Sequence, residues 1–363
     1  MKLKIHENAQ VAFNQEGDRL LSQVRTTPST PTTAGPVPQT GDGSGRFYPV
    51  AELNLEEMTN VVDYMKVPGT GIVSKRKRFG PLCHGFDEDG YRALRLLAEK
   101  VQRYKGVREK VSAEAMDEAV FDWAVDRHLG RTEQTLCERL LEEFESRIKE
   151  RWMWVAAYGV FSQYDFELGR TTIHPFKAAF FEKWESVVRA RGGWEDERTQ
   201  AFVRMVRSKL QGHMACTMKV VAEPVRAREI AVEEAENALT MLRLFLPSIA
   251  HPLVPSYCRA RGLEEVEFNT VLVIENDEVV RYTPKHDEVE TFDLDSDLMD
   301  MAQQLGLRVL HELYLKEKKT EFEKDLLRSL FTFSRSSLQK GPSERLVYVF
   351  RALDSFLLLN ATE

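Results

Sequence analysis

A histidine and a cysteine stand at metal-ligand spacing in the tetrapeptide HMAC. His213 and Cys216 are three residues apart, so on a helix both side chains would leave from one face, as paired zinc ligands do. A site needs two further ligands, and Cys258 and His251 are the only distant candidates. Because no second paired ligand motif supports them, we interpret His213 and Cys216 as ordinary half-buried side chains and predict no metal site.

An aspartate run in the stretch DLDSDLMD has the first half of a calcium-loop pattern. Asp293, Asp295 and Asp297 alternate with other residues, as the first ligands of such a loop do. The loop would next need glycine at 298 and glutamate at 304, but the chain has Leu298 and Gln304. We therefore interpret the run as acidic residues that precede a helix and suit the positive end of its dipole.

An arginine and a histidine in RTTIH could form an acid–base pair. Arg170 and His174 are four residues apart, so on a strand both would lie on the same face. A surface pair on a strand explains the pattern equally well. The chain has no phosphate-binding loop of the Walker type, no dinucleotide-binding glycine pattern and no nucleophile elbow. No cofactor is predicted.

Four consecutive basic residues in SKRKRFG, residues 74–80, could contact a nucleic-acid backbone. They are Lys75, Arg76, Lys77 and Arg78. A solvated loop with no ligand is the alternative interpretation. Further basic residues on two expected helices could likewise meet RNA phosphates or only solvent: Arg204, Arg207, Lys209, Arg226 and Arg228.

Composition limits the class of protein. The chain has 363 residues with 50 basic and 57 acidic side chains, so its net charge of −7 does not favour wholesale nucleic-acid binding. Four widely spaced cysteines do not make a disulfide framework. The start, MKLKIHENAQ, lacks the apolar core of a signal peptide, and no apolar run approaches the roughly 18 residues of a membrane span. We expect a cytoplasmic protein that does not enter a membrane.

The pattern of elements predicts an α+β fold that is mostly α-helical. An N-terminal segment, 1–48, contains a linker rich in Pro, Thr and Gly at 26–45 that we expect to be disordered. A helical region follows at 49–150. A mixed α/β region with a β-hairpin or small sheet spans 151–290, and the chain ends in helices at 296–363.

Particular elements follow from local patterns. Apolar spacing predicts a helix over 53–65 and an amphipathic helix that opens at Thr132. Aromatic and β-branched residues predict strands within 152–175 and at 215–222. The best strand signal is a hairpin over 266–284, turning at its central Asn-Asp pair.

Three helices are expected near the C-terminus. The first runs from 297 to about 318. The second opens at Thr320, with Glu323 completing a capping box, and the third opens at Ser343 as its N-cap. The third helix carries one apolar stripe: Leu346, Val349, Phe350, Leu353, Phe356 and Leu357.

The pieces 325–330, 333–337, 344–347 and 351–359 resemble the start of an ApeA-type HEPN domain. In that family an "LL.AL…FSRA" helix precedes a short loop and a helix reading roughly "DRLV…ALE.LLL…E". Asp354 stands where the family usually has glutamate. The resemblance implies an all-helical bundle, often dimeric, that in many members cleaves RNA in anti-phage defence.

The resemblance does not supply catalytic residues. The family's signature is an arginine followed four to six residues later by a histidine, on a helix downstream of the last one here. Arg308 and His311 have only two residues between them and lie one helix too early. No catalytic residue is therefore predicted, and the bundle is expected to be incomplete.

The apolar side chains of Leu353, Phe356 and Leu357 need partners on other helices. A partner protein, a second copy in a homodimer, or residues beyond 363 could supply them. The leading hypothesis is a HEPN-like component of bacterial antiviral defence whose ribonuclease site is absent from this chain and is completed beyond residue 363 or by a partner. The alternative is a non-catalytic regulatory or binding protein, recognised or processed by a partner effector such as a CRISPR-associated protease.

Overall fold

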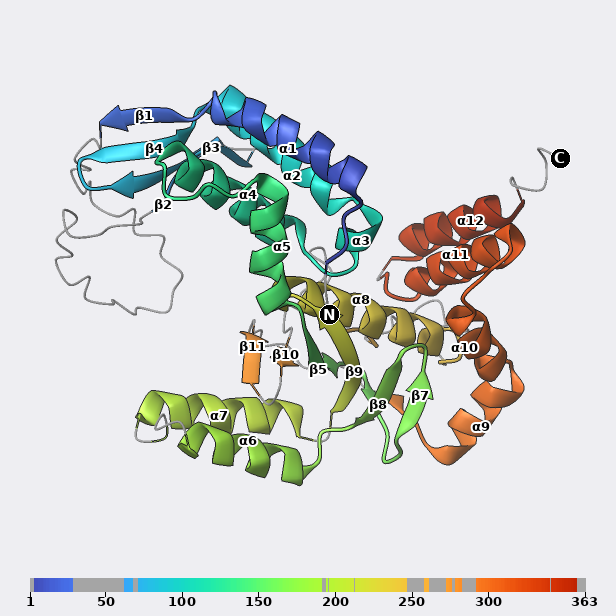
Figure 1. The fold of residues 1–363 in the computed structure, drawn as a ribbon. Coiled ribbons are helices and arrows are strands. Elements are labelled where there is room, and N and C mark those ends of the chain that lie inside the picture. The colour runs from blue at the N-terminus through green and yellow to red at the C-terminus, as the bar shows by residue number, and fades with distance from the viewer. Residues whose placement is uncertain are drawn as a thin grey trace. The chain divides into compact units, whose positions relative to one another are not determined.

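The computed structural model describes residues 3–28, 62–67, 71–190, 194, 196–211, 213–246, 258–260, 272–275, 278–282, 292–339 and 341–357. These ranges contain twelve α-helices and three sheets, so the predicted α+β, mostly helical class is confirmed. The chain forms two compact units (Figure 1). Unit 1 comprises 1–149 and 222–226, and unit 2 comprises 150–221 and 227–363.

Unit 1 contains an antiparallel sheet of four strands in the order β1-β4-β3-β2. The strands are β1 (Arg25–Pro28), β2 (Val62–Val67), β3 (Gly71–Phe79) and β4 (Leu82–Phe86). Gly80, with a positive φ of 59°, makes the tight turn from β3 to β4.

Three expectations for this part of the chain are corrected by the sheet. The basic stretch 74–80 is largely strand β3 rather than a loop, and 62–65 are strand rather than helix. Residues 26–28, expected in the linker, pair with β4. The region 49–150 is therefore not helical throughout. The rest of the predicted linker, 29–45, lies outside the described residues.

Five helices complete unit 1: α1 (Glu7–Leu21), α2 (Glu88–Gln102), α3 (Lys105–Arg108), α4 (Ala113–His128) and α5 (Leu136–Arg147). Their starts are set by side-chain caps. Asp87 and Ser112 cap α2 and α4, and Thr135 with Glu138 forms a capping box on α5. The predicted start of α5 at Thr132 is wrong because only Thr135 has a glutamate three residues later.

The main sheet of unit 2 has the order β11-β10-β5-β9-β8-β7. Its strands are β5 (Lys149–Ala157), β7 (Phe166–Leu168), β8 (Thr171–Pro175), β9 (Met214–Ala222), β10 (Leu272–Glu275) and β11 (Glu278–Tyr282). A two-stranded parallel pair joins β6 (Val160–Phe161) to β12 (Phe292–Asp293). The predicted strands in 152–175 and at 215–222 are confirmed. Of the hairpin predicted over 266–284, β10 and β11 pair antiparallel, and 266–271, 276–277 and 283–284 lie outside the described residues.

Two helices of unit 2, α6 (Ala178–Ala190) and α7 (Glu197–Leu210), run side by side (Figure 1). They share a core with the sheet that is rich in aromatic side chains. Helix α8 (Pro224–Arg243), whose first turn belongs to unit 1, carries a row of wholly buried alanines on its inner face: Ala227, Ala231, Ala235 and Ala238.

Four helices follow: α9 (Ser296–Gln304), α10 (Leu307–Leu315), α11 (Glu321–Ser336) and α12 (Pro342–Leu357). The single helix predicted over 297–318 is wrong. Gly306 has a φ of 109°, which breaks the helix between α9 and α10. The capping box of Thr320 and Glu323 is confirmed. Helix α12 begins at Pro342, so Ser343 lies inside its first turn instead of capping it.

A buried arginine ties α8 to α11. Arg243 is wholly buried, and its guanidinium donates to Ser334 Oγ at 3.2 Å and to Glu236 Oε1 at 3.0 Å. It also donates to Thr240 Oγ1 and to the carbonyl of Cys258. A buried cation is tolerated only when its donors are used, so this network fixes α11 on the scaffold of unit 2.

Candidate functional site

Helices α11 and α12 pack against each other and lie side by side in Figure 1. Leu327 of α11 and Ala352 of α12 are buried. Arg345 is also buried, and it donates to the carbonyls of Gln339 and Ser337 at 3.0 and 3.3 Å. These carbonyls lie at the C-terminal end of α11, where cationic donors stabilise a helix. The pair is thereby held by the inner face of α12.

The outer face of α12 carries large apolar side chains in solvent. Leu346, Phe350, Leu353 and Leu357 are 54, 60, 47 and 59% exposed, and Val347 beside them is 47% exposed. The first four recur at i, i+4, i+7 and i+11, so they form one narrow stripe. We name these five residues the α12 apolar face. Scattered exposed leucines are ordinary, but a contiguous stripe marks an interaction surface.

The residues of the predicted stripe lie on two different sides of α12. Leu353 and Leu357, predicted at a partner interface, lie on the α12 apolar face. Phe356 lies instead at the seam with α11, half-buried, with its ring edge-on to Phe322 at 5.8 Å between centroids. Phe322 is itself 55% exposed and extends the apolar surface onto α11.

Val347 was absent from the predicted stripe. The signal that could have found it is local, since it stands three residues before Phe350 on the same side of the helix.

The basic residues of β3 are engaged within unit 1. Lys75 is 4% exposed, and its Nζ lies 3.2 Å from Asp117 Oδ1 of α4 and over the ring of Phe121. Lys77 Nζ lies 3.0 Å from Asp122 Oδ1, also on α4. The two lysines therefore hold the sheet to α4 rather than forming a free basic patch.

The two arginines of this run alternate with the lysines along the strand. Arg76 Nη1 donates to Thr27 Oγ1 of β1 at 3.4 Å, and Arg78 is 8% exposed. An RNA contact by all four basic residues would require side chains on both faces of one strand.

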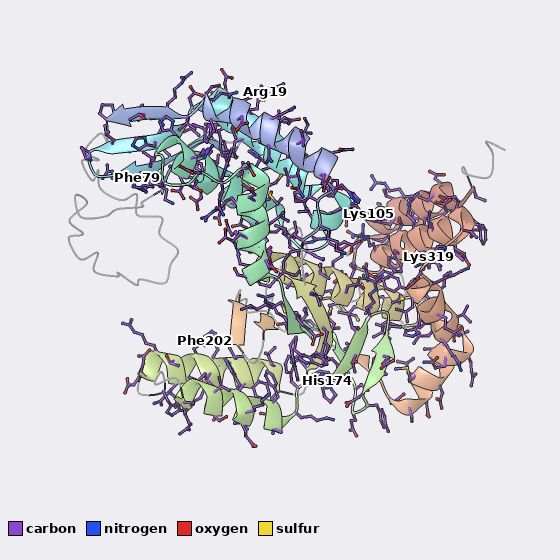
Figure 2. All side chains as sticks on the ribbon, viewed as in Figure 1. Arg19, Phe79, Lys105, His174, Phe202 and Lys319 are labelled. Atoms are coloured by element: carbon purple, nitrogen blue, oxygen red, sulfur yellow. The ribbon has the colours of Figure 1, made fainter. Side chains whose placement is uncertain are left out.

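Arg170 and His174 are not brought together as an acid–base pair. Arg170 lies in the turn before β8 and pairs with Glu234 of α8 at 3.3 Å. His174, labelled in Figure 2, lies edge-on to Trp154 at 4.8 Å between ring centroids. Burial lowers the pKa of His174, although its neighbouring carbonyl and Asp165 oppose this. Each residue has a structural partner of its own.

The HMAC residues serve the core. His213 stacks on Phe161 at 4.8 Å between centroids, and Cys216 is wholly buried on β9. Burial raises the pKa of Cys216, and it raises the pKa of the buried Cys258 to about 12. The described part of the chain contains no cluster of three or more histidine, cysteine or acidic side chains suited to a metal. His251 lies outside the described residues.

Asp295 caps helix α9 by accepting from Leu298 N at 2.8 Å, and Asp297 lies in the first turn. This agrees with the interpretation of the aspartate run as a helix start. Asp293 belongs to β12.

Arg308 and His311 border a small cavity of about 320 Å³ between α10 and β7. Arg308 Nε donates to Glu312 Oε1 at 3.0 Å, and Gly169 N donates to His311 Nδ1 at 3.0 Å. Since Nδ1 accepts this bond, a neutral His311 carries its proton on Nε2. Both side chains are thus engaged within unit 2. On α7, Arg207 likewise pairs with Glu185, at 3.2 Å, while Arg204 is exposed.

No family model, curated protein or solved structure matches this chain. Across the described ranges, no helix is both long and apolar enough to cross a membrane. Function must therefore be inferred from the structure alone, and its strongest functional feature is the α12 apolar face.

Proposed function

We propose that this protein is a HEPN-like component of bacterial antiviral defence that pairs with a second copy of itself through the α12 apolar face. The single observation that carries the proposal is the stripe of large apolar side chains exposed on one side of α12. The sequence pieces that resemble the family are 325–330, 333–337, 344–347 and 351–359. They fall on or next to the α11–α12 pair as far as residue 357, and 358–359 lie outside the described residues. The resemblance implies association of helical bundles.

A second copy is favoured by the chemistry of the face. The stripe itself is uncharged, while the exposed Arg351 and Asp354 lie beside it on α12. In a two-fold arrangement the same patch meets itself, so an uncharged stripe buries no like charges and each flanking arginine can approach the partner's aspartate.

The ribonuclease activity that the resemblance implies would need residues from outside this helix pair. Neither α11 nor α12 contains a histidine, so the Arg–His signature of the family has no place on either helix. Helices that pack beside the pair in the assembled protein would contribute it.

The test is the molar mass of the purified protein in solution by light scattering coupled to gel filtration. We expect a dimer, twice 41.8 kDa, for the native sequence. The double variant Phe350→Asp, Leu353→Asp should be a monomer, because two charges would have to be buried in the interface. Val309→Asp is the matched control, since Val309 is 67% exposed and belongs to α10 rather than to the stripe on α12. It should leave the dimer intact.

A second function is favoured by one observation: Arg308 donates to Glu312 within α10 and His311 accepts from Gly169 N, so both side chains have structural partners. This supports a non-catalytic regulatory protein that a partner effector, such as a CRISPR-associated protease, recognises or processes. Incubating the assembled protein with labelled RNA separates the two. Cleavage favours the ribonuclease, and intact RNA favours the regulatory protein.

A further inference from the structure

Two histidines of unit 1 share one threonine hydroxyl. His84 lies on β4, His128 is the last residue of α4, and Thr26 lies on β1 opposite His84. Thr26 Oγ1 is 3.0 Å from His84 Nδ1 and 3.3 Å from His128 Nε2. The two imidazole rings are 5.8 Å apart between centroids. The hydroxyl oxygen has two lone pairs, so it can accept from an N–H of each ring, which joins the three side chains in one network and leaves the hydroxyl proton for a further acceptor.

This network of three side chains runs from the interior of unit 1 to its surface. His84 is 6% exposed, whereas Thr26 and His128 are exposed. Only Nε2 of His128 is used by Thr26, which leaves its Nδ1 for another partner.

An arginine lies near the histidines. The guanidinium of Arg131 lies 4.0 Å from the centroid of the Phe79 ring, and that ring lies 5.9 Å from the ring of His84. Phe79, labelled in Figure 2, is at the end of β3. Within the described ranges the Arg131 side chain forms no ion pair and no hydrogen bond. Stacking on a ring holds the guanidinium in place and leaves its N–H donors open.

The electrostatics around these groups favour a negative ligand. Burial lowers the pKa of His84, and positive charge on His128 and Arg131 lowers it further, with no acidic residue acting in the opposite sense. The nearby Asp122 is already paired with Lys77 at 3.0 Å. A cation would meet the guanidinium, and two imidazoles alone are too few for a stable metal site.

We propose that His128, Arg131 and Thr26 form a binding site for a phosphate group. Arg131 supplies a planar pair of donors to two phosphate oxygens. His128, as an imidazolium, donates one N–H to Thr26 and the other, on Nδ1, to phosphate, and Thr26, which accepts from both rings, donates its hydroxyl proton. His84 is a positioning residue, because its ring holds the Thr26 hydroxyl in place. The site stands independently of the α12 apolar face, and phosphate of an inorganic ion or of a nucleotide has the chemistry that it recognises.

Titration of the full-length protein with inorganic phosphate, and separately with adenosine monophosphate, tests the site. Binding is followed by the imidazole proton signals of His84 and His128 in NMR spectra, assigned by single substitution. We expect saturable shifts of both signals with each ligand. Equal affinities identify the phosphate alone as the recognised group, and tighter binding of the nucleotide shows that the nucleoside adds contacts to the same site.

Two variants probe the donors. Arg131→Gln and Thr26→Val should each weaken phosphate binding about tenfold or more, because each removes a hydrogen bond to a charged oxygen. Arg92→Gln and Thr27→Val are the matched controls, an exposed arginine of α2 and the neighbouring threonine of β1, and should bind as the native protein does. Unchanged melting temperatures show that the variants are folded. The proposal is overturned if neither ligand shifts the two signals, or if Arg131→Gln binds phosphate as tightly as Arg92→Gln.

Discussion

Removing Asp117 should destabilise unit 1 strongly, because it would leave Lys75 buried without its carboxylate. Lys75 is 4% exposed, and the side chain of Asp117 is 19% exposed. At 3.2 Å and an effective dielectric constant of about 20, the attraction between the charges is at most about 5 kcal/mol. Solvent access at Asp117 reduces this figure. We expect Asp117→Ala to cost about 3 kcal/mol of the unfolding free energy of unit 1, the usual cost of breaking a buried pair.

Hydrogen exchange followed by mass spectrometry reports on this unit alone. A loss of about 3 kcal/mol should speed exchange of the most protected β3 amides about a hundredfold. Adding Lys75→Met to Asp117→Ala should restore about 2 kcal/mol, because the buried charge is then gone. The control is the exposed pair Lys100–Glu16, with a separation of 2.8 Å and side chains 60 and 34% exposed. Glu16→Ala should cost less than about 1 kcal/mol.

The result that would refute this reasoning is a small effect of Asp117→Ala, similar to that of Glu16→Ala. Lys75 would then be solvated rather than buried, and the basic run would again be available to a phosphate backbone.

Two further predictions concern the interiors of the two units. The pKa of His84 is lowered below its ordinary 6.5 by burial, His128 and Arg131, so the unfolded chain takes up the proton first and stability should fall as the pH drops below 6.5. Urea midpoints of unit 1 between about pH 8 and about pH 5 should show this fall, and His84→Gln should flatten it; a pH-independent midpoint would contradict it. Arg243→Met should cost unit 2 about 3 to 5 kcal/mol in urea unfolding, because it orphans a buried hydrogen-bond network. Arg308→Met, which removes an exposed ion pair on α10, is the control and should cost less than about 1 kcal/mol of unfolding free energy. Equal costs for the two variants would show that the Arg243 network stabilises unit 2 no more than a surface ion pair does.

Helix starts with local chemistry could be predicted from the sequence. The side chain of Thr320 accepts from the backbone N–H of Glu323, and the side chain of Glu323 accepts from the backbone N–H of Thr320. Four consecutive residues therefore contain the whole signal. The break at Gly306 could not be predicted in this way, because a glycine inside a helix costs only about 1 kcal/mol and neighbouring contacts decide whether the helix continues.

The basic strand β3 was hidden for a different reason. Its charged residues lie on both faces, so the sequence has no alternation of apolar and polar residues. The lysines are accommodated by Asp117 and Asp122, which lie more than 40 residues away in the chain.

The same limit applies to the candidate sites. The outward stripe of α12 follows from helical spacing within one element, and the sequence indicated it in part. Thr26 is 58 positions from His84 and 102 positions from His128 in the sequence, so no local pattern can reveal the contact. The pairing of β1 with β4 sets Thr26 opposite His84, and the packing of α4 on the sheet adds His128.

The central claim is that the α12 apolar face joins two copies of the chain. The most direct measurement is the molar mass of the native protein, the double variant Phe350→Asp, Leu353→Asp and the control Val309→Asp in solution. We expect twice 41.8 kDa for the native protein and the control, and 41.8 kDa for the double variant. A native protein that stays at 41.8 kDa at every concentration tested, or a double variant that remains a dimer, would contradict it.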